Sequence, residues 1–185
     1  SGLTGSVGIG HTRWATHGEP SDLNAHPHTD YTGKFALIHN GIIENYAALK
    51  KLLEKKGVEF RTQTDTEVLV QLISTIYHEE DTTFQSAVTS ALEKIVGTYG
   101  IIVMCSDVPN QLIAARLGSP LVLGVGEGEY FIASDASPLV EYTRNVIYLG
   151  ESECLFIGDD GYEIKKLGNS ESINKKVSRI DFTLE

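Results

Sequence analysis

The spacing of short apolar segments after Gly97 is the feature that most constrains how this chain can fold. Each segment has the length and composition of a buried β-strand, and Gly, Pro, Asn or Asp separates it from the next. The segments occupy residues 99–104, 112–115, 121–125, 130–133, 144–149, 154–157, 162–164 and 177–180. Strands that follow one another so closely are joined mainly by hairpins, so the sequence predicts largely antiparallel sheets.

Helical periodicity dominates the first half of the chain. Residues 45–56 place their apolar side chains on one helical face. Thr64 and Glu67 have the spacing of a capping box, and apolar residues at helical spacing follow them. Thr83 precedes a third amphipathic segment and can cap it in the same way. The sequence therefore predicts three helices before the run of strands.

Two further strands are predicted at residues 7–12 and 35–39, where short apolar runs interrupt the polar sequence. Helices in the first half must cover at least one face of a sheet. The pattern predicts an α+β fold, with residues 1–185 forming one domain, because a chain of this length can bury a sizeable core.

The composition argues against several classes of function. The chain has 15 Lys and Arg against 25 Asp and Glu, which gives a net charge of −10 without any basic run. Nucleic acids and anionic membrane surfaces are therefore poor candidate partners. No apolar run approaches the ~20 residues of a membrane span. Two cysteines are too few for a disulfide framework and indicate a reducing, cytoplasmic location.

Two segments resemble common binding motifs. Gly124 to Glu129 looks like a nucleotide-binding loop, but Glu129 stands at its last glycine and a strand follows, so a hairpin turn is predicted. His26 and His28 could form half of a metal site, although no carboxylate or thiol lies nearby at ligand spacing. We expect hydrogen-bonded loop histidines, no metal and no cofactor, with a metal-dependent protein as the weaker alternative.

Three segments combine polar residues that could act together on one substrate. Arg13 follows a predicted strand and can present a bidentate fork to a carboxylate. Asn40 and Gly41 could aim a side-chain amide and a backbone N–H at one point, as the donors that stabilise an oxyanion do. Asp65 offers a fixed carboxylate to an ammonium group. Together they would suit an α-amino acid whose side-chain carbonyl is attacked.

Each of these features also has a purely structural interpretation. Arg13 could be an exposed cation beside a tryptophan packed in the core. Asn40-Gly41 between apolar residues is first of all a hairpin signal. Asp65 could simply compensate the dipole of the helix that starts there. Spacing alone does not establish that the three segments converge.

The motifs nevertheless resemble one family in sequence and in order. They are His11 to Gly18, Asn24 to His28, His39 to Asn45, Thr64 to Glu67, Ala114 to Leu121 and Phe131 to Asp135. These segments are similar to the class II glutamine amidotransferase (glutaminase) domain of the glucosamine-6-phosphate synthase family, also called glutamine–fructose-6-phosphate aminotransferase. The similarity covers most of the chain, and the first motif with Trp14 is specific.

The resemblance implies the N-terminal-nucleophile hydrolase fold, a four-layer αββα sandwich of mainly antiparallel sheets. It also implies hydrolysis of L-glutamine to glutamate and ammonia. In that family the ammonia passes to a sugar-phosphate isomerase domain of the same protein, which converts fructose 6-phosphate to glucosamine 6-phosphate. A homo-oligomer is expected for the complete enzyme.

Site roles carried over from the family follow the matching motifs. Arg13 should bind the α-carboxylate of glutamine and Asp65 its α-ammonium group, while Asn40 and Gly41 form the oxyanion hole. The remaining residues that should line or close over the glutamine pocket are Trp14, Thr16, His17 and His26.

The family's nucleophile, an N-terminal cysteine, has no counterpart in this chain. Ser1 opens a segment that aligns better with the stretch just before the Arg13 motif. Cys105 and Cys154 lie in apolar strand patterns and are expected to be buried structural thiols. We therefore expect an N-terminally truncated domain without its first strands, without the isomerase domain, and inactive on its own. The alternative is a module that binds glutamine or glutamate without hydrolysing it.

Overall fold

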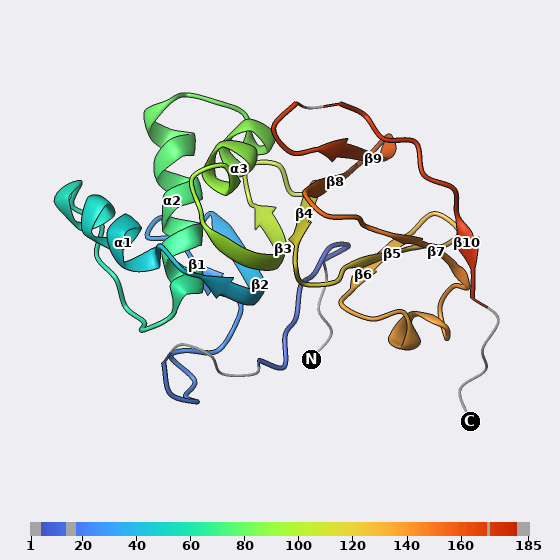
Figure 1. Ribbon diagram of the computed structural model, residues 1–185, viewed down its shortest axis with the longest axis horizontal. Helices are drawn as coiled ribbons and strands as arrows, with labels where there is room; N and C mark the ends of the chain where they lie inside the picture. The colour runs from blue at the N-terminus through green and yellow to red at the C-terminus, as the bar shows by residue number, and fades with distance from the viewer. Residues whose placement is uncertain (1–4, 14–17, 170, 181–185) are drawn as a thin grey trace.

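The computed structural model describes residues 5–13, 18–169 and 171–180. It consists of two antiparallel sheets packed face to face, with three helices on the outer side of the larger sheet (Figure 1). All strand pairs within the two sheets are antiparallel, as the strand spacing predicted.

The larger sheet has six strands in the order β1-β2-β3-β4-β8-β9. Their bounds are His28–Thr29 for β1, Phe35–Ile43 for β2, Gly97–Cys105 for β3, Leu112–Leu117 for β4, Glu153–Gly158 for β8 and Gly161–Lys166 for β9. Strands β2 and β3 form the longest ladder, with nine paired residues on each strand. Strand β1 has no counterpart among the predicted strands.

The smaller sheet has four strands in the order β10-β7-β5-β6. Their bounds are Ser178–Arg179 for β10, Asn145–Tyr148 for β7, Val122–Val125 for β5 and Tyr130–Ala133 for β6. The glycine-rich segment between β5 and β6 is the predicted hairpin turn, closed by a hydrogen bond from the N–H of Gly126 to the carbonyl of Glu129.

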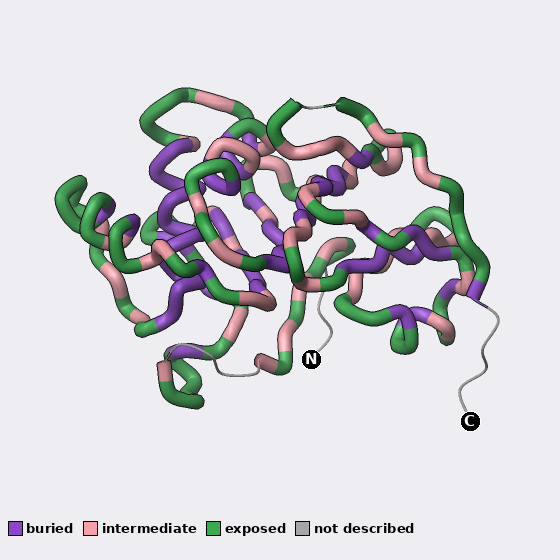
Figure 2. Tube along the Cα trace, in the orientation of Figure 1, coloured by how far each residue is buried: buried purple, intermediate pink, exposed green. Residues whose placement is uncertain are grey.

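The helices are α1 (Tyr46–Lys55), α2 (Asp65–Glu79) and α3 (Phe84–Leu92). Thr64 caps α2 by accepting a hydrogen bond from the N–H of Glu67, and Thr83 caps α3 in the same way. Both threonine caps are therefore confirmed. The reciprocal half of the predicted capping box is not formed, because the Glu67 carboxylate accepts from the N–H groups of Arg61 and Thr62 and the N–H of Thr64 donates to the Thr62 hydroxyl. Every residue of α2 from Asp65 to Ile76 is buried, which makes α2 the central helix of its layer (Figure 2).

Alternating side chains of the larger sheet fill two separate cores. Leu37, Ile101 and Val103 face the helices, whereas their neighbours Ile38 and Ile102 face the smaller sheet. The strands of this sheet are thus apolar on both faces, which explains why their sequences read as continuous apolar runs.

The outer face of the smaller sheet has a thinner cover. Among the described residues the 3-10 turn η1 (Ser137–Leu139) packs there, with Leu139 against Val122 and Val146. The four-layer sandwich implied by the resemblance has a helical layer on this side too, but the described residues contain only this one turn there. Eleven residues link β6 to β7, with a proline at position 138, and this leaves no room for a long helix.

The strand predicted at residues 7–12 is wrong. Residues 7–13 form an irregular segment without a ladder to any strand in the described parts of the chain. Ile9 packs against the core between the sheets, which accounts for the apolar pattern. The apolar run therefore identified a segment that is partly buried, whereas a strand also requires a hydrogen-bonded neighbour.

Asp30 fastens helix α2 to the turn between β1 and β2. Its carboxylate accepts hydrogen bonds from the N–H of Phe35 at 2.9 Å and from the hydroxyls of Ser74 at 2.6 Å and Thr32 at 2.5 Å. These hydrogen bonds outweigh the effect of burial and lower the pKa of Asp30 below its usual value.

Replacing Asp30 with Ala should lower the free energy of unfolding by on the order of 3 kcal/mol, because buried donors lose their acceptor. Denaturant unfolding measures this loss. The matched control is Asp107→Ala, which removes an exposed ion pair with Lys34 and should have a much smaller effect. Equal losses in the two variants would contradict the anchoring role.

Candidate active site

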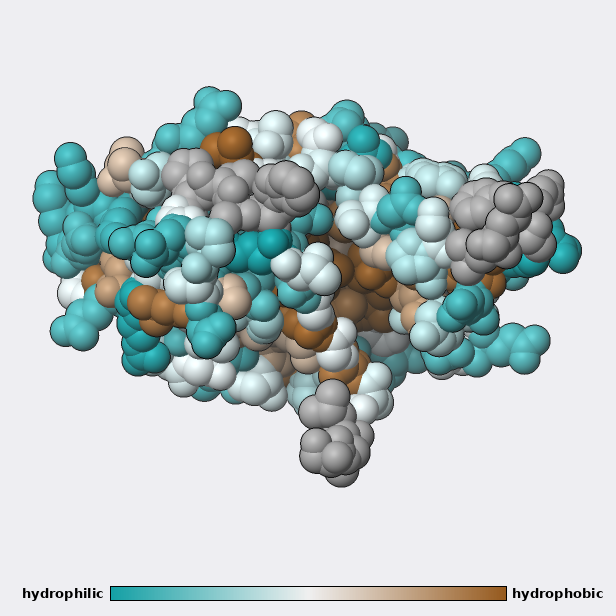
Figure 3. Space-filling model, turned by 90° about the horizontal axis from the view of Figure 1, so that it is seen from below, coloured by the Kyte–Doolittle hydropathy of each residue, from teal (hydrophilic) through white to brown (hydrophobic). Residues whose placement is uncertain are grey.

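A cleft of about 600 Å³ lies between the two sheets. Figure 3 shows a hollow with hydrophobic walls on the face seen from below. The polar residues among those that line the cleft are His11, Thr12, His39, Asn40 and Ser134. The apolar walls come from both sheets, chiefly Ile38, Ile102, Leu121 and Ile132. The cleft therefore offers a few polar groups within a largely apolar space, as small-molecule sites commonly do.

Asn40 and Gly41 do not form the hairpin turn that their sequence favours. They lie inside β2, opposite Gly100 and Tyr99 of β3. Gly41 has φ = +129°, and a Cβ atom there would lie 2.2 Å from the carbonyl oxygen of Thr98. This close approach of the two strands requires glycine. The structural interpretation as a turn is thus wrong, and a strand carries both predicted oxyanion donors.

Two histidines, His11 and His39, lie at the part of β2 that lines the cleft. Nε2 of His11 lies 2.7 Å from Oδ1 of Asn40. Nε2 of His39 lies 3.3 Å from the carbonyl oxygen of Thr98, and its Nδ1 lies 3.1 Å from the hydroxyl of Thr66. Because a carbonyl can only accept, Nε2 of His39 carries the proton in this bond. His39 is therefore a bracing residue between β2, β3 and α2.

Arg13 stands in a left-handed conformation with φ = +43°. Its guanidinium donates to the carbonyl oxygens of Gly18 and Glu19, both at 3.2 Å. Asn24, which is buried, donates to the same Glu19 carbonyl and accepts from the N–H of Gln63. Arg13 is thereby connected to the chain that leads directly into α2.

Asp65 is the first residue of α2 and is 3% exposed. Its Oδ2 accepts a hydrogen bond from the N–H of Ile43 at 2.8 Å and lies 4.0 Å from Nδ1 of His39. The carboxylate thus sits at the end of β2, beside the strand that carries Asn40 and Gly41. Its position at the helix N-terminus also stabilises its negative charge, so the helix-dipole interpretation and a binding role are compatible.

His26 and His28 extend the row of imidazoles from the cleft to α2. The His26 ring lies 4.6 Å from that of His11 and 5.0 Å from that of His28. Nε2 of His28 lies 2.9 Å from the hydroxyl of Thr64. Burial, together with the neighbouring cationic groups, lowers the pKa of His26 to about 3, and burial also lowers the pKa of His28. Both rings are neutral at physiological pH.

The histidines form no metal centre in the parts of the chain that the structure describes. No three His, Cys, Asp or Glu side chains come together there as metal ligands would. Nδ1 of His26 is buried without a hydrogen-bond partner among these residues.

Three predicted pocket residues, Trp14, Thr16 and His17, lie outside the described residues. The two cysteines behave as expected of structural thiols. Both are buried, and burial raises the pKa of Cys105 and raises that of Cys154 to about 12. Neither lines the cleft that contains Asn40.

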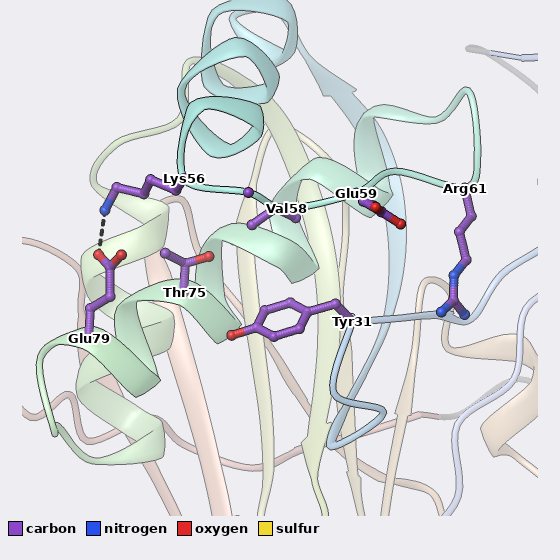
Figure 4. A pocket seen from close by; sticks show the side chains of 8 residues that line it. Tyr31, Lys56, Val58, Glu59, Arg61, Thr75 and Glu79 are labelled. Atoms are coloured by element: carbon purple, nitrogen blue, oxygen red, sulfur yellow. Dashed lines mark hydrogen bonds and ion pairs between the residues drawn. The ribbon is translucent and has the colours of Figure 1, made fainter.

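A second cavity of about 380 Å³ lies between the β1–β2 turn, the α1–α2 loop and α2. Figure 4 shows that Tyr31 spans this cavity, with Lys56 paired to Glu79 on one side and Arg61 on the other. It contains none of the predicted site residues. Its charged side chains (Lys56, Arg61, Glu59 and Glu79) balance in number and are exposed, so the cavity indicates no particular ligand.

None of the helices in the described residues combines the length and apolarity needed to cross a bilayer.

Comparison with known proteins decides the family. The glutamine amidotransferase domain family matches residues 11–141, which is most of the chain. The chain belongs to this family. Two curated relatives are both named glutamine–fructose-6-phosphate aminotransferase (isomerizing). The one from Chlorobaculum tepidum is 51% identical over 99% of the chain, and the one from Thermococcus kodakarensis is 48% identical over 99%. The chain spans 30% of the length of each relative.

Solved amidotransferase structures confirm the α+β fold with antiparallel sheets. Glutamine phosphoribosylpyrophosphate amidotransferase from B. subtilis matches with a TM-score of 0.71 and 27% identity, over 86% of this chain and 34% of that one. An allosteric regulatory enzyme of purine biosynthesis matches with a TM-score of 0.68 and 27% identity, over 80% of this chain and 32% of that one.

Sequence reasoning missed three residues that brace the predicted site residues. His11 contacts Asn40, 29 residues away, and the backbone of Thr98 lies against Gly41. Asn24 acts indirectly, because it donates to the Glu19 carbonyl that Arg13 also binds and accepts from the N–H of Gln63. The motifs contained His11 and Asn24, but residue spacing gave no indication of their partners. Thr98 carried no local signal, because its role comes from the strand pairing.

The lowered pKa of His26 predicts a pH dependence of stability. His26 takes up a proton near pH 6.5 in the unfolded chain, but only near pH 3 in the folded chain. Between these two pH values the unfolded chain binds more protons, so the free energy of unfolding should fall as the pH drops from 6.5 toward 3. His26→Phe keeps an aromatic ring without a titrating group and should flatten the slope, measured by urea unfolding. His78→Phe, the same substitution at an exposed position, is the control. Identical slopes in wild type and His26→Phe would contradict the assignment.

Proposed function

We propose that this domain is the glutaminase part of a glutamine–fructose-6-phosphate aminotransferase and that its site hydrolyses L-glutamine to glutamate and ammonia. The observation that carries this proposal is the placement of Asn40 in the cleft between the sheets, beside His11, which begins the Arg13 motif. The names of the two relatives support the choice of reaction.

The oxyanion would form at Asn40 and Gly41. When a nucleophile attacks the side-chain carbonyl of glutamine, the carbonyl oxygen becomes negatively charged. The Asn40 amide and the Gly41 N–H would donate to it, and loss of one such donor typically lowers the rate on the order of 10²–10³-fold. The β2–β3 ladder holds both donors, which limits the reorganisation needed during the reaction.

Arg13 and Asp65 would bind the two charged groups on the α-carbon of glutamine. The Arg13 guanidinium now donates to two neutral carbonyl oxygens. Exchange of these for the α-carboxylate gives charge-assisted, bidentate hydrogen bonds. Asp65 keeps one oxygen on the N–H of Ile43 and would use the other for the α-ammonium group. The remaining pocket residues in this proposal are Trp14, Thr16, His17 and His26.

The nucleophile would come from a cysteine that is not among the 185 residues. Both cysteines present are buried away from the cleft, so we propose that the chain as given does not hydrolyse glutamine. Strand β6 is the last strand of its sheet and borders the cleft through Ile132 and Ala133. The outer edge of β6 has no strand partner among the described residues. This edge and the apolar cleft favour pairing with a further strand, as in the full N-terminal-nucleophile sandwich.

The ammonia would serve a sugar-phosphate isomerase domain in the same protein, which makes glucosamine 6-phosphate from fructose 6-phosphate. In this proposal residues 1–185 act as one domain, and the complete enzyme is a homo-oligomer. The alternative is a module that binds glutamine or glutamate without hydrolysis, and the absence of a cysteine from the cleft favours it for the isolated chain.

Ammonia release from L-glutamine distinguishes these possibilities. The natural full-length protein should release ammonia, whereas this 185-residue chain should not, and a coupled glutamate dehydrogenase assay measures both. Release by the isolated chain at the full-length rate would contradict the proposed inactivity. No release by the full-length protein, together with equal glutamine affinity in wild type and Asn40→Ala, would favour the binding module.

Replacing Arg13 with Ala in the full-length protein should lower kcat/KM for glutamine by roughly 100-fold, because the α-carboxylate loses its charged partner. Binding of fructose 6-phosphate should remain unchanged, since a different domain provides that site. Arg179→Ala, at an exposed position of β10, is the matched control and should retain full activity. Undiminished glutamine turnover in Arg13→Ala would exclude this role.

A further inference from the structure

We propose that His11 is a positioning residue that fixes the side-chain amide of Asn40 with its N–H groups available to the cleft, and that links this orientation to the backbone at Arg13. The inference rests on the proposed glutaminase function. It assigns a task to a histidine that the expected site roles leave without one.

Two hydrogen bonds in series carry the argument. The backbone N–H of Arg13 donates to Nδ1 of His11 at 2.8 Å. On the other side of the ring, Nε2 lies 2.7 Å from Oδ1 of Asn40. The two contacts join residues 13 and 40 through one imidazole, and His11 and Asn40 line the same cleft.

The first of these bonds determines the tautomer of His11. A backbone N–H can only donate, so Nδ1 must accept and carries no proton. A neutral imidazole then has its proton on Nε2, and Nε2 must donate to whatever it meets. Asn40 therefore has to present its oxygen to His11.

This constraint decides how Asn40 faces a substrate. With Oδ1 engaged by His11, the amide nitrogen of Asn40 and its two N–H donors are left for the cleft. If the amide rotated by half a turn, its oxygen would face the developing oxyanion and repel it. An asparagine can adopt both orientations at little cost unless a neighbour selects one, and His11 is that neighbour.

The His11 ring is itself held in place. It packs on the ring of His26 at 4.6 Å between centroids, with 38° between the ring planes. His26 contacts His28, which reaches the Thr64 cap of α2. Because His26 is neutral, the contact between the two rings adds no like-charge repulsion at physiological pH. The row of rings therefore supports a fixed plane for His11.

The bond to Arg13 gives the arrangement a second consequence. Arg13 has φ = +43°, a conformation that non-glycine residues adopt rarely, and its N–H reaches back to Nδ1 of His11 from there. The guanidinium of the same residue holds the carbonyls of Gly18 and Glu19. Movement of Arg13 toward the α-carboxylate of a substrate would thus be transmitted to the side-chain amide of Asn40, which faces the side-chain carbonyl of the same substrate.

The test uses three variants of the natural full-length protein. The amide nitrogen of Gln lies about as far from Cβ as Nε2 of His, so His11→Gln retains a donor to Asn40. The amide of Asn corresponds in position to Nδ1, so His11→Asn can accept from Arg13 but does not reach Asn40. His11→Ala removes both contacts. His78→Ala, at an exposed position in the last turn of α2, is the control.

We expect kcat for glutamine hydrolysis to fall roughly 10-fold or more in His11→Ala and His11→Asn. In His11→Asn, which retains the contact to Arg13, KM and glutamate affinity should stay within about twofold of wild type. His11→Gln should recover most of the lost kcat. A residue with a purely structural role would not separate His11→Gln from His11→Asn at equal thermal stability. That comparison also remains decisive if His11→Ala fails to fold.

A double-mutant cycle with Asn40→Ala tests whether His11 acts through Asn40. Removing His11 should cost little once Asn40 is gone, so the combined loss in kcat should be far smaller than the product of the single losses. Multiplicative losses, or an unchanged kcat in His11→Asn, would overturn the inference while wild-type activity stands. An inactive wild-type protein would instead overturn the proposed function itself.

Discussion

The first turn of helix α2 is the interaction on which the rest of the site depends. Four consecutive buried residues, Thr64, Asp65, Thr66 and Glu67, each bind a different part of the chain: His28, the N–H of Ile43, His39 and the loop at residues 61–62. Buried polar groups are costly unless they are paired. Their pairing therefore holds β1, β2 and the α1–α2 loop in one arrangement around the helix end.

This arrangement explains the position of the candidate site residues of β2. Strand β2 contacts the helix at Ile43, and Gly41 and Asn40 precede this contact by two and three residues, with Asn40 lining the cleft. The close approach to Thr98 keeps that strand against β3 at the same point. His26 and His28 connect His11 to Thr64 at the start of α2. Their lowered pKa values keep both rings neutral, so no cluster of positive charges forms next to Arg13.

Local patterns predicted the helices, their Thr64 and Thr83 caps and the antiparallel strands, because each depends on neighbours within a few residues. They failed where a distant partner decides the structure. The Asn40-Gly41 pair has the sequence of a turn, but the packing of Thr98 against Gly41 places it within a strand. Residues 7–12 have the sequence of a strand, but no strand among the described residues pairs with them. The resemblance identified Arg13, Asn40 and Asp65 as candidates, but the link from His11 to Asn40 spans 29 residues and has no local signal.

The most direct test of the central claim is a crystal structure of the natural full-length protein with L-glutamate bound. Our account predicts the α-carboxylate on Arg13, the α-ammonium group on Asp65, and the side-chain carboxylate within hydrogen-bond distance of the Asn40 amide nitrogen and the Gly41 N–H. Glutamate bound outside the cleft between the sheets, or Asn40 presenting its oxygen to the ligand, would contradict it.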